Sequence, residues 1–273
     1  MLAALLLAGS FAAAAPAPEP VLEFRVSGAA AAALPLSELR TKLKTRAVTF
    51  ASEFSSPPGK VKRYEAFALR DALDLAYGKH WLAPDFSHVA FVALDGYAAV
   101  GALTKAEEDG GYVAFRDLDA ASGWEPVGTH QADPGPFFVV WTGSKQTTAD
   151  QYPWPWQVTA INLIRFEDQY PRTVPRGAPE GSPVRLGYRL FQGRCVRCHA
   201  VNGEGGKIGP DLNEPMSVTA YRSKEMVKEF IRNPSKYRHT YMPDHLDLSA
   251  EDLENLWLYF HHLDGRRPDG PGW

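Results

Sequence analysis

Cysteine is nearly absent from this sequence. Only two of its 273 residues are cysteines, Cys195 and Cys198, and they lie three positions apart. A disulfide framework needs several cysteine pairs, and a cysteine-based zinc site usually draws on a second pair elsewhere in the chain. A disulfide framework does not fit two neighbouring cysteines, so both thiols need another role.

The chain also lacks a long apolar run and an excess of either charge. Its net charge of -3 gives no reason to expect a nucleic acid partner. The N-terminal stretch of about 15 mostly apolar residues is shorter than the roughly 20 that span a bilayer. Its small residues before Pro16 are typical of a secretory signal peptide, although a positively charged start is missing. We expect a signal peptide at 1–17, a periplasmic location and no membrane span in the mature form.

Length and composition predict two domains joined by a proline-rich segment. With 45% hydrophobic and 22% charged residues, a chain of this length can bury two cores. Residues 171–183 place a proline at every fourth position and hold few apolar side chains, as in a semi-rigid interdomain linker. The expected organisation is an α+β domain over 20–170, this linker, and an all-α domain over 184–273.

Hydrophobic periodicity supports a change of fold class at the linker. Before it, alternating and β-branched runs predict strands at 21–26, 61–67, 88–94 and 158–166, with helices at 35–43 and 68–78. After it, the pattern predicts helices at 184–193, 223–233 and 249–262. In the last helix, Ser249 and Asp252 have the spacing of a capping box.

The run Cys195-Val-Arg-Cys198-His199 has the spacing of a c-type haem attachment site. The two thiols can add to the two haem vinyl groups, and a histidine directly after the second cysteine is placed to bind the iron. A redox dithiol and half of a zinc site are the alternatives. Export, the lack of a second cysteine pair and a downstream sulfur ligand favour one covalently bound haem c.

Met242, in Tyr241-Met242-Pro243, is the candidate for the second iron ligand. A thioether there would raise the reduction potential relative to a second histidine. Its competitors are Met216, Met226, His239 and His245. We expect Met226 in the helix core and the two histidines on the surface, which leaves Met216 as the strongest competitor.

Together these motifs resemble the class I cytochrome c family over about residues 184–263. The matching elements are Gly187, Phe191, the Cys195–His199 motif, Gly209-Pro210-Asp211-Leu212, Asn233-Pro234, Tyr241-Met242-Pro243 and the final aromatic helix. The resemblance implies that the Pro210 carbonyl braces His199. It also implies that Gly187 and Phe191 let the first helix of the domain cross the last near Trp257.

Two further expectations concern the same domain. Three short helices bury little surface, so the haem should supply much of the core and its loss should unfold the domain. Basic side chains near the attachment and methionine segments could steer an acidic redox partner, or form an ordinary solvated surface. They are Arg189, Arg194, Arg197, Lys207, Lys236 and Arg238.

The N-terminal domain resembles, more faintly, the molybdopterin-binding domain of the sulfite oxidase family. The residues that carry this likeness are 21–26, 36–39, 61–73, 93–97, 135–140 and 156–167. In that family a cysteine after the first helix binds molybdenum, and residues 46–54 here contain none. We therefore expect a sulfite oxidase-like fold without molybdopterin, kept for docking or positioning.

These features predict a periplasmic cytochrome that carries single electrons to or from a redox partner protein, a dehydrogenase or an oxidase. An iron filled on both faces has no open position for substrate, which favours an electron carrier or a cytochrome subunit over a stand-alone enzyme. The alternatives are a haem enzyme and a ligand-sensing redox module that uses the N-terminal domain as its substrate or ligand site. The predicted haem-binding residues are Cys195, Cys198, His199, Pro210 and Met242, with His199 and Met242 as the iron ligands.

Overall fold

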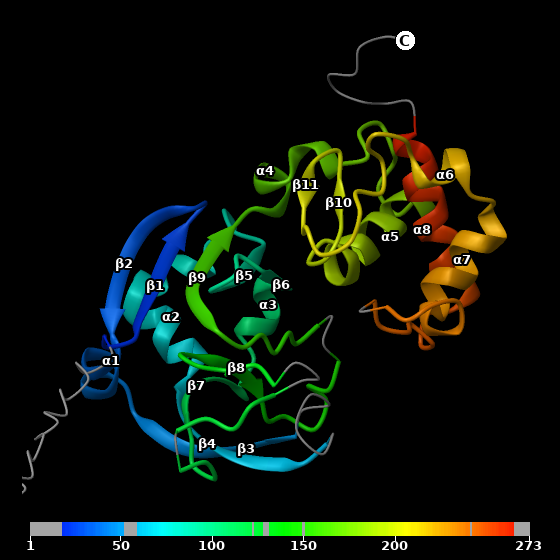
Figure 1. Ribbon diagram of the computed structural model, residues 1–273. Helices are drawn as coiled ribbons and strands as arrows, with labels where there is room; N and C mark the ends of the chain where they lie inside the picture. Colours follow the sequence, from blue (N-terminus) through cyan, green and yellow to red (C-terminus); the bar gives the residue numbers. More distant parts are fainter. Residues whose placement is uncertain are drawn as a thin grey trace, which may run out of the picture.

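The structure, a computed structural model, describes residues 18–51, 59–121, 123–127, 131–148, 151–240 and 242–264. The expected signal peptide at 1–17 lies outside these residues. A sheet-rich N-terminal domain is followed by a helical C-terminal domain (Figure 1). The mixture of sheets and helices confirms the α+β class expected for the first domain. Within the described residues, no helix combines the length and apolar character needed to cross a membrane.

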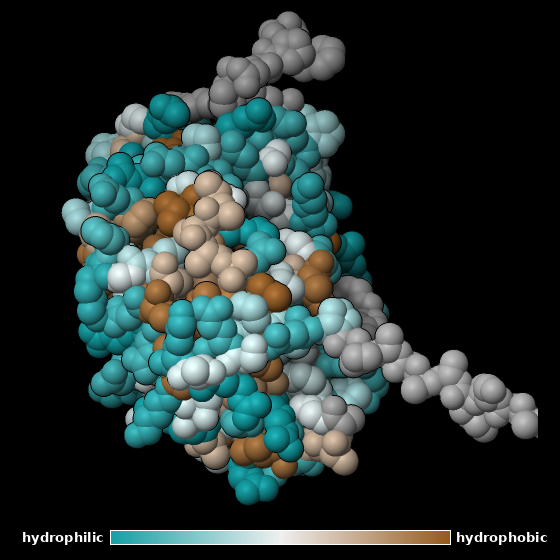
Figure 2. Space-filling model, turned by 90° about the vertical axis from the view of Figure 1, so that its left-hand side faces the viewer, coloured by the Kyte–Doolittle hydropathy of each residue, from teal (hydrophilic) through white to brown (hydrophobic). Residues whose placement is uncertain are grey.

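A five-stranded sheet forms one part of the N-terminal domain. Its strands are β1 (Val21–Val26), β2 (Ala29–Pro35), β5 (His88–Ala93), β6 (Ala98–Ala102) and β9 (Val158–Ile164). The order is β2-β1-β9-β5-β6, in which β1 and β9 are parallel and the other neighbours antiparallel. The alanines of β2 are mostly exposed and leave apolar surface along this edge of the sheet (Figure 2).

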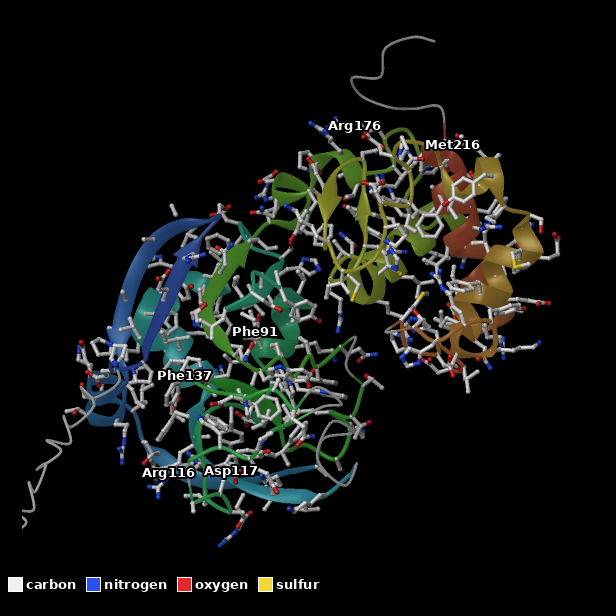
Figure 3. The ribbon with its side chains drawn as sticks, in the orientation of Figure 1. Phe91, Arg116, Asp117, Phe137, Arg176 and Met216 are labelled. Carbon is white, nitrogen blue, oxygen red and sulfur yellow. The ribbon has the colours of Figure 1, made fainter. Side chains whose placement is uncertain are left out.

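A second, antiparallel sheet has the order β3-β4-β7-β8. Its strands are β3 (Thr45–Ala51), β4 (Val61–Ala68), β7 (Gly111–Asp117) and β8 (Phe138–Trp141). The helical segments of the domain are α1 (Leu36–Lys42), α2 (Leu69–Tyr77), η1 (Gly78–Leu82), α3 (Leu103–Ala106) and α4 (Phe166–Gln169). Both sheets and α2 share one core, in which Phe91 and Phe137 are fully buried (Figure 3).

The C-terminal domain is mainly helical. Its helical segments are α5 (Pro183–Leu190), the π-helical turn η3 (Phe191–Cys195), α6 (Val218–Tyr221), α7 (Lys224–Arg232), η4 (Pro234–Lys236) and α8 (Ala250–Leu263). The two-residue strands β10 (Ala200–Val201) and β11 (Glu204–Gly205) also pair, so the expected all-α class holds apart from this small hairpin. The capping box at the start of α8 is present and confirms the assignment of Ser249 and Asp252.

The first and last helices of this domain cross at Gly187. A Cβ atom there would lie 1.9 Å from the carbonyl oxygen of Asn255 and 2.9 Å from Cβ of Tyr259, so only glycine permits this approach. The expected crossing near Trp257 is confirmed, since Asn255 and Tyr259 lie two residues on either side of Trp257. The Trp257 ring itself stacks on His261 one helical turn later, with an interplanar angle of 8°.

The proline-rich segment 171–183 is packed against the C-terminal domain. It begins with the 3-10 turn η2 (Pro171–Thr173), and Thr173 is fully buried. The Thr173 carbonyl accepts a 2.7 Å hydrogen bond from the Tyr259 hydroxyl, and the Arg172 amide donates to Glu204. Backbone groups of this segment therefore find partners on the domain that follows, and its role as an interdomain linker stays a prediction.

The two domains share an apolar cluster. Ala90, Val100, Ile164 and Phe166 of the N-terminal domain are buried in the same cluster as α5, η3 and α8. The Phe166 ring lies 6.1 Å from the Tyr188 ring, edge to face. The fold therefore fixes the N-terminal domain against the segment that carries both cysteines.

Candidate functional site

The two cysteines lie on one tight turn. Cys195 ends η3, and its carbonyl accepts hydrogen bonds from the amides of Cys198 (3.1 Å) and His199 (2.8 Å). Both thiols are free of any disulfide. The turn therefore presents two thiols and an imidazole from five consecutive residues.

The surroundings of the thiols disfavour both alternative roles of the motif. Burial raises the pKa of Cys195 to about 12 and also raises the pKa of Cys198, partly opposed in each case by the charge of Arg197. A redox-active dithiol depends on a lowered pKa, which is the opposite trend. Among the described residues no group of three His, Cys, Asp or Glu side chains could hold a metal ion, so a zinc site has no further ligands.

His199 is oriented by the loop that follows it. Its Nδ1 lies 2.8 Å from the carbonyl oxygen of Pro210. Because a carbonyl only accepts, Nδ1 carries the proton and the lone pair of Nε2 is left to bind a metal. Burial lowers the pKa of His199, which favours the neutral ring that metal binding requires.

Gly209 provides the space in which the His199 ring stands. A Cβ at position 209 would lie 2.3 Å from Cε1 of the ring, and the Gly209 amide donates a 2.8 Å hydrogen bond to the Cys198 carbonyl. Asp211 secures the same loop by accepting from the amides of Gly203 and Asn213. These contacts form a cradle for the imidazole, and they involve a glycine for which the sequence had suggested no separate role.

Met242 lies in a loop that is tied to the cysteine segment. Met242 is half-buried, and its amide donates to Thr240 Oγ1 at 3.1 Å. The loop is held by Arg194, whose guanidinium pairs with both carboxylate oxygens of Asp247 at 3.1 and 2.6 Å. The role of Met242 as the second iron ligand stays a prediction.

The two competing methionines are both exposed. Met216 is 54% exposed and lies at the α6 end of the domain (Figure 3). Met226 is 44% exposed, so the expectation that it belongs to the helix core is wrong. The reason is the phase of α7, in which Val227 is buried and Ile231 packs against the core while Met226 faces outward.

The expected basic rim is partly neutralised. Arg194 pairs with Asp247, and Arg189 lies 3.8 Å from Glu180. Lys207 is exposed beside the His199 loop. The sequence alone did not show these pairings, because each joins residues from different segments.

The C-terminal site now has a histidine with one free ring nitrogen, two adjacent thiols and a glycine cradle. Residues 184–264 match the family model of cytochrome c. The C-terminal domain belongs to this family. The resemblance of this domain to class I cytochromes c is thereby confirmed, and the family implies haem c and a haem-based role in electron transfer.

A curated relative matches a short part of the chain. Cytochrome c oxidase subunit 2 of Alkalihalophilus pseudofirmus is 30% identical over 92 residues, which cover 31% of this chain and 27% of the relative. The chain thus spans about a quarter of that relative's length. The family match begins at residue 184 and does not test the N-terminal domain. The likeness of that domain to the sulfite oxidase family and its lack of molybdopterin therefore stay predictions.

Proposed function

We propose that the protein is a periplasmic cytochrome that carries one electron at a time on a single haem c. The haem is bound covalently at Cys195 and Cys198, with His199 and Met242 as iron ligands. The N-terminal domain serves the docking of a redox partner. The observation that carries this proposal is the hydrogen bond between His199 Nδ1 and the Pro210 carbonyl, which leaves Nε2 available beside the two thiols.

The residues of the site fit a haem in chemistry. When bound, the haem supplies an iron that takes up and releases one electron. Cys195 and Cys198 hold the macrocycle, and the raised pKa of each thiol disfavours disulfide exchange. His199 is kept in one tautomer by Pro210, and Val196 and Cys195 of the attachment segment pack into the apolar cluster of both domains.

The partner is proposed to be a dehydrogenase or an oxidase. The relative's name points to an oxidase, and the shared core of the two domains keeps the N-terminal domain beside the cytochrome c domain for such a contact. Iron with two protein ligands has no open position, which favours an electron carrier or cytochrome subunit over a stand-alone enzyme.

The decisive experiment is expression in a host that matures c-type haem, followed by mass spectrometry of the denatured protein. We expect the mass of one haem to remain attached, and its attachment to be lost when both cysteines are replaced by alanine. The reduced absorption spectrum should be that of His/Met haem and should not change with carbon monoxide. A denatured chain without added mass would refute the proposal, whereas a carbon monoxide complex would favour a haem enzyme.

A further inference from the structure

The N-terminal domain contains a cavity of about 330 Å³ at its four-stranded sheet. Residues of β3 and of the segment after β8 line this cavity together, although these strands are the two edges of the sheet. In Figure 1 the sheet lies in the lower part of the N-terminal domain. The volume is at the small end of the range of small-molecule sites in proteins. The cavity therefore has room for one small ligand, and its lining indicates which kind.

Three aromatic rings line the cavity. Phe50 and Trp141 are buried, and Trp154 is half-buried with its ring 5.8 Å from that of Phe50. The indole of Trp141 is held in place, because its Nε1 donates a 2.8 Å hydrogen bond to the Pro153 carbonyl. Aromatic rings pack favourably against one another, either offset-stacked or edge to face. The lining therefore offers a preformed contact surface for a planar aromatic compound.

The polar groups of the lining are neutral. Exposed hydroxyl groups, which can donate or accept hydrogen bonds, come from Thr49, Thr142 and Thr147. Gln146 is buried, and its side-chain amide is fixed at 2.9 Å by the Gly143 amide and at 2.9 Å by the Asp109 carbonyl. None of the described residues that line the cavity carries a charge. An ion would lose its hydration there without gaining a counter-charge, so the lining selects an uncharged ligand.

We propose that this cavity binds an uncharged heteroaromatic compound, with its ring against Phe50, Trp141 and Trp154 and its polar edge at the threonine hydroxyls. Because the rings and Gln146 are already fixed, little side-chain freedom is lost on binding. The inference goes beyond the proposed function and does not depend on it, since no lining residue belongs to the haem-binding segment. It gives the N-terminal domain a small-molecule site in addition to any contact with a redox partner.

Isothermal titration calorimetry of the full-length protein, purified from a host that matures c-type haem, tests the proposal with three probes. Caffeine is an uncharged purine, urate is a purine that is negatively charged at neutral pH, and glucose is an uncharged ring without aromatic character. We expect saturable one-to-one binding of caffeine with a Kd on the order of 1 mM, which suits so small a ligand. Urate and glucose should bind at least about tenfold more weakly.

Two variants test where caffeine binds. Ala51 is exposed at the end of β3, so Ala51→Phe should fill the cavity without disturbing the core and should abolish caffeine binding. Trp154→Leu keeps an apolar side chain but removes the half-buried ring, so it should weaken caffeine binding about fivefold.

Each variant has a matched control. Ala47 is exposed on the same face of β3 as Ala51, and Trp156 is half-buried against the same aromatic cluster as Trp154, but neither lines the cavity. Ala47→Phe and Trp156→Leu should therefore bind caffeine as the native chain does. Circular dichroism of each protein shows whether it is folded.

The outcomes separate this inference from the proposed function. Absence of saturable caffeine binding, equal binding of urate or glucose, or native binding by Ala51→Phe would overturn the inference. Equal binding by Trp154→Leu and Trp156→Leu would do the same, because the ring would then have no contact with the ligand. A chain without covalent haem that still binds caffeine at this cavity would remove the proposed function and leave this inference standing.

Discussion

At the scale of single residues, the site depends on how little room surrounds His199. Gly209→Ala would place a methyl group 2.3 Å from the ring, a distance that side chains do not adopt. The ring or the loop must move, which in a packed site costs about 1–3 kcal/mol. We expect a lower free energy of unfolding and a weakened His/Met absorption spectrum, measured by urea titration and spectroscopy of the haem-loaded protein.

Ile208→Ala is the control for this variant. Ile208 precedes Gly209 in the same loop and is 60% exposed, so its truncation should leave both the spectrum and the unfolding curve close to native. A Gly209→Ala protein indistinguishable from Ile208→Ala would show that the imidazole is not confined as the structure describes.

Met242 allows a second prediction at this scale. Met242→Ala should remove the second iron ligand, so the reduced protein should bind carbon monoxide and its potential should fall. Met216→Ala and Met226→Ala are matched controls because both side chains are exposed thioethers. The measurement is the absorption change on adding carbon monoxide to each reduced protein. If a control variant responds and Met242→Ala does not, the ligand has been assigned to the wrong methionine.

At the scale of elements, the crossing of α5 and α8 at Gly187 sets the shape of the cytochrome c domain. Gly187→Ala would bring its Cβ within 1.9 Å of the Asn255 carbonyl oxygen, which belongs to rigid helix backbone. The helices must separate, so we expect a loss of unfolding free energy of about 2 kcal/mol or more. Thermal unfolding followed by circular dichroism measures it. A melting temperature equal to that of the native protein would contradict the close crossing.

Elements with a strong local signal could be predicted from the sequence, and those fixed by distant partners could not. The capping box at Ser249 begins α8 and the glycine after α2 ends that helix, each through contacts within one turn, and both could be predicted. Strand β2 was missed because a run of alanines has no alternation, and its state is set by pairing with β1. The packing of segment 171–183 was not predicted because its partners, Glu204 and Tyr259, lie far along the chain.

The candidate site divides in the same way. The cysteines, His199, Pro210 and Met242 could be named because the attachment motif and its companions have fixed spacing. The pairing of Arg194 with Asp247 joins residues 53 positions apart and has no sequence pattern. Met226 is exposed because of the face that α7 turns toward the core. The sequence of one short amphipathic helix does not fix that face to better than one residue.

At the scale of the whole molecule, the junction between the domains should respond to pH through His88. The His88 ring lies 5.1 Å from the Phe166 ring, and Phe166 belongs to the cluster that joins both domains. Burial lowers the pKa of His88 from 6.5 to about 4. Between these values the unfolded chain binds a proton that the folded protein does not, so stability is complete above pH 6.5 and declines as pH falls toward 4.

We therefore expect the free energy of unfolding to decrease between pH 6.5 and pH 4, and His88→Gln to flatten part of that decrease. Burial lowers the pKa of His199 as well, so His199 contributes in the same direction and some dependence should persist in the variant. Urea unfolding at half-unit pH steps, with the native chain and His88→Gln side by side, isolates the His88 share as the difference between the two slopes. If the free energy of unfolding has the same slope against pH in the native chain and in His88→Gln, then His88 takes up its proton in the folded protein. The His88 ring would in that case be open to water rather than buried.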